Sequence, residues 1–257
     1  MLKKRLIFTL LLDNDNFVLS RNFTLQAVGD YNWFIKNYNL EYLKYSIDEL
    51  IILNVSREKK NINFLKTVEK IIKKFYCPLA LGGGVGCLDT AKNYFSLGAD
   101  KIVINSLIFE NSKVVKELSG IYGKQSIVGS IDYKYENNQK VVLYKNGQYK
   151  VNKNFSDILK NLINIGIGEI YLTCIDKDGT GQGLDLDLMK KKNIFINVPI
   201  ILSGGAGTYT HLLEALKINT VNAVSTANIY NFMGKNLYEA RNFCITNKIN
   251  LVNWIKY

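Results

Sequence analysis

Val198–Gly207 reads Val-Pro-Ile-Ile-Leu-Ser-Gly-Gly-Ala-Gly, a short apolar run that ends abruptly in small residues and glycines. This pattern is typical of a buried strand that runs into a tight turn. Backbone N–H groups left open between a strand and a helix can bind a phosphate group. The stretch therefore predicts a buried strand and an anion-binding turn at its carboxyl end.

The same pattern occurs earlier, at Cys77–Gly86, which reads Cys-Pro-Leu-Ala-Leu-Gly-Gly-Gly-Val-Gly. At one constant offset, Pro78, Leu81, Gly83, Gly84 and Gly86 match Pro199, Leu202, Gly204, Gly205 and Gly207. Ile47–Leu50 is echoed by Ile167–Ile170, and Arg5–Leu12 corresponds to Gln125–Asp132. The chain is therefore predicted to consist of two similar halves, approximately residues 1–122 and 123–257.

Apolar strands alternate with amphipathic helical segments along the whole chain. The predicted strands are Arg5–Leu12, Glu49–Val55, Leu79–Gly82, Lys101–Asn105, Ser126–Asp132, Glu169–Cys174, Ile200–Ser203 and Ala223–Thr226. Helical patterns between them include Tyr31–Leu43, Asn63–Phe75, Leu88–Leu97, Ser112–Ile121, Phe155–Ile165 and Thr208–Leu216. Eight β-α units in series predict a single (β/α)8 TIM barrel of two half-barrels over residues 1–257. An open doubly wound sheet is the alternative, but it would not explain two equivalent turns.

Composition fits one domain of this kind. An α/β barrel typically needs about 250 residues, and this chain has 257, of which 47% are hydrophobic. The net charge is +11, but no run of five basic residues occurs. We therefore expect lysines spread over helix faces rather than a nucleic-acid site.

Cysteine usage and the first residues favour a cytoplasmic protein. Cys77, Cys87, Cys174 and Cys244 form no CxxC pair, which is typical of reduced thiols. The apolar start of the chain is short and meets Asp13-Asn14-Asp15 without a cleavage site, so we interpret it as the first strand and not as a signal peptide. No stretch is long enough to predict a membrane span.

The site of such a barrel lies at the carboxyl ends of its strands. In the first half these ends carry Gly82, Gly83, Gly84, Asn105 and Ser106, and in the second half Ser203, Gly204, Gly205, Ala206, Ala227 and Asn228. Two anion-binding turns across one mouth suit a small molecule with a phosphate at each end. The alternative is that the glycines only permit tight turns.

Two strand ends add polar groups to this mouth. Thr173 and Asp176 are expected to face it, and Asp178-Gly179-Thr180 forms either a turn that holds the ligand or an ordinary Asp-Gly turn. Asp132 is a candidate general acid or base, or else a helix cap. Its partner in the repeat is Leu11, so the first half lacks the carboxylate that the second half has.

These motifs resemble the cyclase subunit of imidazole glycerol phosphate synthase, and the resemblance covers essentially the whole chain. The motifs that carry it are Lys4-Arg5, Asn22-Phe23, Ile47–Leu50, Gly82–Gly84, Gly98–Lys101, Ile131-Asp132, Asp176–Thr180 and Ser203–Gly207. The resemblance implies a barrel that takes ammonia from a glutaminase at its bottom and joins it to a bisphosphorylated ribonucleotide at its top. It implies two catalytic aspartates, at the ends of strands 1 and 5. We expect no cofactor and no metal.

The resemblance to this family fails at the catalytic positions. Asp132 fills the strand 5 position, but Leu11 stands at the strand 1 position, and Leu19 and Asn54 replace a lysine and an aspartate of the family. Asp13 or Asp15 would have to reach in from farther along the chain, about 7 Å or more beyond Leu11. These changes predict that cyclisation is lost.

The bottom of the barrel matches the family. Arg5, Glu49, Lys101 and Glu169 correspond to its charged gate for ammonia, and Asp100 to a residue that faces the glutaminase. The alternative is a ring of ion pairs that merely closes the barrel.

Three functions remain open at this point. The first is that of a cyclase-like offshoot with a similar Leu-Leu-Leu start, which works with a glutaminase and a separate sugar amidotransferase to make acetamidino sugars. The second is an ordinary histidine-pathway cyclase with a rewired site. The third is a catalytically silent scaffold that activates the glutaminase.

Overall fold

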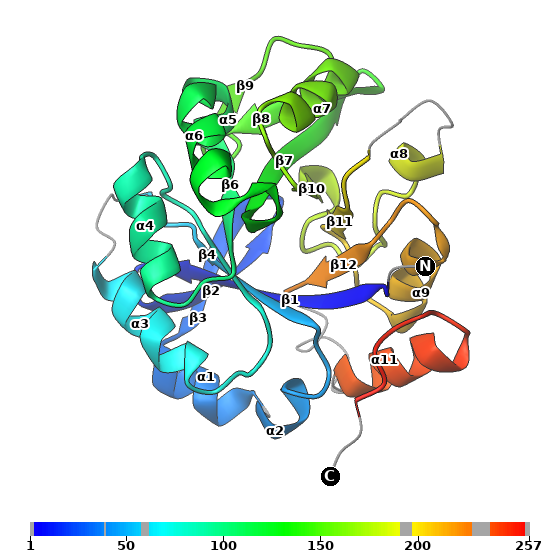
Figure 1. Ribbon diagram of the computed structural model, residues 1–257. Coiled ribbons are helices and arrows are strands. Elements are labelled where there is room, and N and C mark those ends of the chain that lie inside the picture. Colours follow the sequence, from blue (N-terminus) through cyan, green and yellow to red (C-terminus); the bar gives the residue numbers. More distant parts are fainter. Residues whose placement is uncertain (1–2, 39, 58–61, 191–196, 228–236, 255–257) are drawn as a thin grey trace.

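The computed structural model describes residues 3–38, 40–57, 62–190, 197–227 and 237–254 (Figure 1). It is a closed parallel barrel with helices around it, as predicted. The barrel strands are β1 (Arg5–Asp13), β4 (Glu49–Asn54), β5 (Leu79–Gly82), β6 (Lys101–Ile104), β7 (Ile127–Glu136), β10 (Glu169–Cys174), β11 (Ile200–Ser203) and β12 (Ala223–Thr226). Each pairs in parallel with the next in this order, and β12 pairs with β1, which closes the barrel. The prediction of a (β/α)8 barrel is confirmed.

Helices surround the barrel on its outer side (Figure 1). In chain order they are α1 (Tyr31–Asn37), α2 (Leu40–Leu43), α3 (Ile62–Ile72), α4 (Leu88–Ser96), α5 (Ser106–Glu110), α6 (Ser112–Tyr122), α7 (Phe155–Asn164), α8 (Asp187–Lys190), α9 (Tyr209–Lys217) and α11 (Leu237–Thr246). Short 3-10 turns lie at η1 (Lys124–Ser126) and η2 (Ile175–Lys177). The prediction of one helix over Tyr31–Leu43 is wrong, because Tyr38 adopts an extended conformation (φ −99°, ψ 128°) that ends α1.

Two β-hairpins extend the barrel above the carboxyl ends of its strands, and the strand pattern did not predict them. After β1 come β2 (Asn16–Arg21) and β3 (Thr24–Gly29), paired antiparallel. After β7 come β8 (Gln139–Tyr144) and β9 (Tyr149–Lys150), also antiparallel. Because β1 and β7 begin the two predicted halves, the hairpins stand at corresponding places in the chain.

Apolar side chains fill two regions of the molecule. The larger lies between the strands and the helices, where residues such as Phe8, Phe34 and Phe64 are fully buried. The smaller lies inside the barrel and consists of Ile7, Ile51, Ala80, Val103, Val128, Tyr171, Ile201 and Ala223. The barrel interior is therefore a packed layer and not an open pore.

The helices of the described residues are all too short or too polar to cross a membrane.

Candidate active site at the barrel mouth

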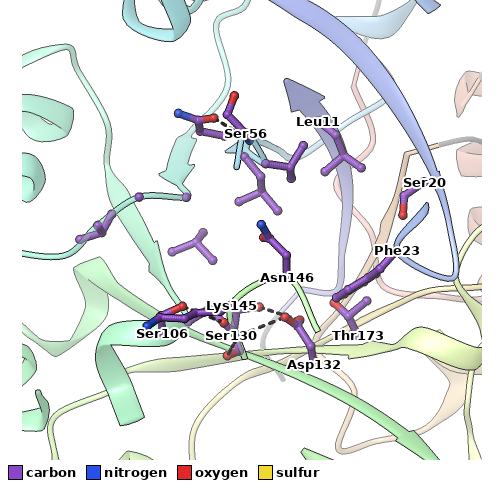
Figure 2. A pocket seen from close by; sticks show the side chains of 18 of the residues that line it. Leu11, Ser20, Phe23, Ser56, Ser106, Ser130, Asp132, Lys145, Asn146 and Thr173 are labelled. Atoms are coloured by element: carbon purple, nitrogen blue, oxygen red, sulfur yellow. Dashed lines mark hydrogen bonds between the residues drawn. The ribbon is translucent and has the colours of Figure 1, made fainter. Parts of the chain in front are cut away.

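A cavity of about 680 Å³ opens at the carboxyl ends of the strands. Figure 2 shows Leu11 and Asp132 on opposite sides of it, with Asn146 between them in this view. The predicted residues that line it are Gly83, Gly84, Asn105, Ser106, Asp132, Thr173, Asp178, Ser203 and Ala227. A separate hollow of about 40 Å³ is lined by Gly179, Gly204 and Gly205, among others. Asn228 lies outside the described residues, and Gly82 is buried in β5.

The glycine turns are dictated by the backbone. Gly83 has φ +84°, and a Cβ there would lie 1.9 Å from the carbonyl oxygen of Asn54. Gly205 has φ +101°, and its Cβ would lie 2.3 Å from the carbonyl oxygen of Gly183. Glycine is required at both positions whatever binds there.

The same turns leave N–H groups open. In the described part of the chain no group accepts a hydrogen bond from the N–H of Gly84 or Gly205, whereas Gly207 donates to His211 Nδ1 (3.2 Å). Gly84 faces the large cavity, where Ser106 at the first turn of α5 also lies. Gly205 faces the small hollow. The two turns can therefore each accept an anion, but in neighbouring spaces.

Asp132 is the central carboxylate of the cavity. It lies inside β7, so it caps no helix. Ser130 Oγ donates to its Oδ1 (3.3 Å) and Asn105 Nδ2 to its Oδ2 (3.1 Å). Burial, helped by the nearby charge of Asp178, raises the pKa of Asp132 to about 7. A carboxyl group that titrates near neutrality can both take up and release a proton.

The opposite wall is apolar. Leu11 at the end of β1 lines the cavity together with Leu53 of β4 and Leu25 of β3. Asp13 and Asp15 are not among the described lining residues, so the structure does not bring them to Asp132. The carboxylate that ends β1, Asp13, is thus not part of the lining of the cavity.

A second carboxylate of the cavity comes from Asp178, just after η2. The hydroxyl of Ser20 and the N–H of Phe23 (3.3 Å) both donate to its Oδ2. Burial raises the pKa of Asp178. Asp178 therefore holds the turn of the β2–β3 hairpin and also lies within electrostatic reach of Asp132.

Both hairpins contribute to the mouth, and sequence reasoning missed them. Asn22 in the β2–β3 turn donates from its N–H to Asp178 O (3.0 Å) and from Nδ2 to Ile175 O (2.9 Å). The β8–β9 turn brings Lys145, Asn146 and Gln148 to the cavity. The signal was available, because Asn146-Gly147 between two runs of β-forming residues favours a tight hairpin.

At the other end of the barrel, four charged side chains form a closed ring of ion pairs, which we call the charged ring. Arg5 Nη1 lies 2.5 Å from Glu49 Oε2, and Arg5 Nη2 contacts Glu169 Oε1. Lys101 Nζ lies 3.0 Å from Glu49 Oε1 and 2.7 Å from Glu169 Oε2. Each cation thus bridges both carboxylates. The side chains of Glu49 and Glu169 are only 2% and 5% exposed, so the ring is largely desolvated.

Asp100, beside the ring, is an exposed residue whose Oδ2 accepts a hydrogen bond from the N–H of Leu79 (2.8 Å). Among the described residues no group of three or more His, Cys, Asp or Glu side chains is arranged to hold a metal ion.

The fold and the two polar ends define a (β/α)8 barrel with a cavity at the carboxyl ends of its strands and the charged ring at its other end. The family described as histidine biosynthesis protein matches residues 24–235. The chain belongs to this family.

Several relatives that match most of this chain are named as subunits of imidazole glycerol phosphate synthase. A protein of Parasynechococcus marenigrum named "Putative imidazole glycerol phosphate synthase subunit hisF2" is 40% identical over 94% of this chain and 90% of its own. Imidazole glycerol phosphate synthase subunit HisF of Leptospira biflexa is 37% identical over 74% of this chain and 76% of its own. The HisF subunit of Sulfurisphaera tokodaii is 35% identical over 85% and 87%. The predicted resemblance is confirmed at this level.

Proposed function

We propose that this chain is the barrel subunit of a cytoplasmic, glutamine-dependent complex. A glutaminase docks at the charged ring, ammonia crosses the barrel, and a phosphorylated small molecule receives it at the mouth. The observation that carries the proposal is the pairing of two sites on the same strands. Glu169 and Thr173 of β10 belong to the ring and to the cavity, respectively. The names of the relatives, which are subunits of a synthase, support it.

At the mouth, the cavity offers an acid–base group and two places for anions. Asp132, with its pKa near neutrality, moves the proton. The open N–H groups at Gly84 and Gly205 bind phosphate groups of the ligand, helped by the hydroxyl of Ser106. Arg57 adds positive charge to the lining of the cavity, whereas Lys145 there is paired with Glu110.

For the reaction itself, the apolar wall favours amidation that is completed elsewhere. Leu11 faces the cavity where a second acid or base would be needed, and Leu19 of β2 carries no charge either. On this reading the barrel delivers ammonia to a sugar amidotransferase for acetamidino-sugar synthesis.

Cyclisation to imidazole glycerol phosphate is the second candidate, and the names of the relatives favour it over amidation. One observation in the cavity also favours it. Asp178 is a second, half-buried carboxylate whose charge raises the pKa of Asp132, so an Asp132–Asp178 pair could divide the acid and base roles. A catalytically silent scaffold that activates the glutaminase is the third candidate, and a cavity lined by a carboxyl group with a pKa of about 7 argues against it.

The deciding assay supplies the bisphosphorylated ribonucleotide and ammonium salt to the purified chain and measures imidazole glycerol phosphate. Loss of one acid or base typically costs about 10²–10⁴-fold. We therefore expect turnover far below about 1 per second, an ordinary enzyme rate.

The control is Leu11→Asp, which restores a carboxylate at the end of β1 and should raise cyclisation if the rest of the mouth is competent. Rapid turnover by the wild-type chain would refute amidation and establish the histidine-pathway cyclase. If the chain does not bind a purified glutaminase of the family in a pull-down, the proposed complex is refuted.

A further inference from the structure

The space between the charged ring and the cavity is crossed by a tyrosine. Along β10, Glu169 belongs to the ring, Tyr171 follows two residues later, and Thr173 lines the cavity. Residues two apart on a strand point to the same face and lie about 7 Å apart along it. The ring of Tyr171 packs in the apolar layer inside the barrel. Its hydroxyl reaches the floor of the cavity, which Tyr171 also lines.

That hydroxyl is one of four hydroxyl groups, from four different strands, that lie together and that we call the hydroxyl cluster. Tyr171 OH donates to Ser203 Oγ (2.9 Å) and lies 3.2 Å from Ser225 Oγ. Ser225 Oγ lies 2.6 Å from Thr9 Oγ1, which is 3.5 Å from Tyr171 OH. Three of these groups are nearly or fully inaccessible to bulk water, with Ser225 1%, Thr9 3% and Tyr171 4% exposed.

The cluster has room beside it and a donor left over. Thr9, Tyr171 and Ser203 border the large cavity, and Ser203 and Ser225 border the small hollow of about 40 Å³. A water-sized molecule needs about 10–15 Å³ of such volume. Because Tyr171 donates to Ser203, the hydrogen of Ser203 has no described acceptor within the cluster and can turn into either space.

The cluster also stays uncharged. Burial raises the pKa of Tyr171, against the lowering effect of its bonds to Ser203 and Ser225. Its hydroxyl is therefore a neutral donor at any physiological pH. The charge of Asp132 opposes ionisation of Tyr171 further and raises its pKa.

We propose that the hydroxyl cluster is the binding site for ammonia, where the molecule is held after it leaves the apolar layer and before it reacts in the cavity. This inference rests on the proposed function. Neutral ammonia has one lone pair and three N–H bonds. A hydroxyl can donate to the lone pair while neighbouring hydroxyl oxygens accept from the N–H bonds. An ammonium ion has no lone pair to accept the hydrogen of Ser203, and none of the four groups of the cluster is a carboxylate, so the cluster favours the reactive, neutral form.

Tyr171→Phe tests the proposal because it removes the hydroxyl and keeps the ring that fills the apolar layer. Tyr133→Phe is the matched control: Tyr133 is equally buried, but its hydroxyl bonds to Asp185 (2.8 Å) and it does not line the cavity. Loss of one neutral hydrogen bond corresponds to about a 2- to 10-fold change in affinity. We expect KM for ammonium salt to rise by that factor in Tyr171→Phe. The ratio of product to glutamate should fall in the glutaminase complex, and kcat at saturating ammonium should hold.

In the control, both quantities should stay at the wild-type values. Equal effects in both variants, or an unchanged KM in Tyr171→Phe, would overturn the ammonia site.

A direct binding measurement separates this inference from the proposed function. The chain is labelled with ¹³C at the tyrosine Cζ atoms, and the Tyr171 signal is identified as the one missing in Tyr171→Phe. Ammonium chloride in mildly alkaline buffer, where much of it is neutral ammonia, should shift that signal. Potassium chloride should not, and ammonium chloride in mildly acidic buffer should not. No shift in any buffer overturns the ammonia site, even if the complex uses ammonia. A shift in a chain that makes no product supports the site while the proposed function fails.

Discussion

Lys101→Ala is the sharpest test of the charged ring. The change removes one of two cations that share two nearly inaccessible carboxylates. Lys101 Nζ contacts both oxygens of Glu49 at 3.0 Å and Oε2 of Glu169 at 2.7 Å. After the substitution Arg5 alone faces Glu49 and Glu169.

The magnitude follows from burial. Breaking a buried pair by removing one partner typically costs about 3–5 kcal/mol. Lys101 itself is 19% exposed, so water can enter after its removal and the cost should lie near the lower end, about 3 kcal/mol. For a chain of this size each kcal/mol lowers the melting temperature by about 2–4 °C, which predicts a loss of about 6–12 °C.

The loss should depend on pH in a defined direction. Burial opposes the charge of Glu169, but Arg5 and Lys101 outweigh it and hold the pKa of Glu169 below its ordinary value of 4.5. A depressed pKa gives stability that is present above the unfolded-state pKa and lost as the pH falls through the folded-state pKa. Removing Lys101 raises the pKa of Glu169, so the variant loses this stability at a higher pH. The gap between variant and wild type should be widest at neutral pH and shrink once Glu169 is protonated in both proteins.

The effect on function is measured in the complete complex by comparing product formation from glutamine with product formation from added ammonium salt. We expect Lys101→Ala to lower glutamine-dependent product formation or to release ammonia to solvent, while activity with added ammonium salt survives. Lys150→Ala, which removes an exposed ion pair with Glu136 (2.9 Å), is the control and should change neither melting nor activity. If both activities fall together with the melting temperature, the ring is structural. If neither changes, ammonia does not pass through the ring.

Two further predictions concern the mouth. Asp132→Asn should lower turnover by about 10²–10⁴-fold, and the wild-type rate should change through a pKa of about 7. Burial holds that pKa above its ordinary value of 3.8, so the wild-type stability that depends on Asp132 is full below pH 3.8 and falls as the pH rises towards 7. Asp132→Asn should therefore raise the melting temperature above neutral pH and not in acid. An equal gain in both pH ranges would contradict the assignment. Crystals soaked in phosphate should show an anion at Gly84 with Ser106 and at Gly205, and two empty turns would refute both anion sites.

The sequence predicted the barrel because its strands are marked by local patterns. Each is a short apolar run bounded by polar or glycine residues, and the observed limits of β5, β10, β11 and β12 coincide with the predicted ones. The hairpins were not predicted because β2 and β8 lack a strong alternation of apolar and polar residues. Both strands were therefore assigned to the segments that connect other elements. The break at Tyr38 was not predicted because the helical periodicity continues through it, whereas the extended backbone of Tyr38 ends α1.

The parts of the site that depend on a single residue could be predicted from the sequence. The parts that form only when distant strands come together could not. Asp132 and Leu11 could be predicted from the repeat, because they occupy corresponding positions in the first strand of each half. The hydroxyl cluster could not, since Thr9, Tyr171, Ser203 and Ser225 meet only after β12 closes on β1. Single Ser, Thr and Tyr residues in apolar strands are common, and nothing in their spacing marks them as neighbours.

The order of groups along the barrel axis explains why such a closed interior could still pass ammonia. The charged ring is followed by the apolar layer around Ile7 and Ile201, then by the hydroxyl cluster, and last by Asp132. Moving an ion into an apolar layer costs far more than moving a neutral polar molecule, because only the ion loses the full solvation of its charge. On the proposed function, the layer would therefore exclude ammonium and other ions and admit the neutral molecule. A carboxylate introduced there, as in Ile201→Glu, should block glutamine-dependent activity and leave the mouth accessible to added ammonium salt. Equal loss with both nitrogen sources, in a variant that still folds, would place the path of ammonia elsewhere.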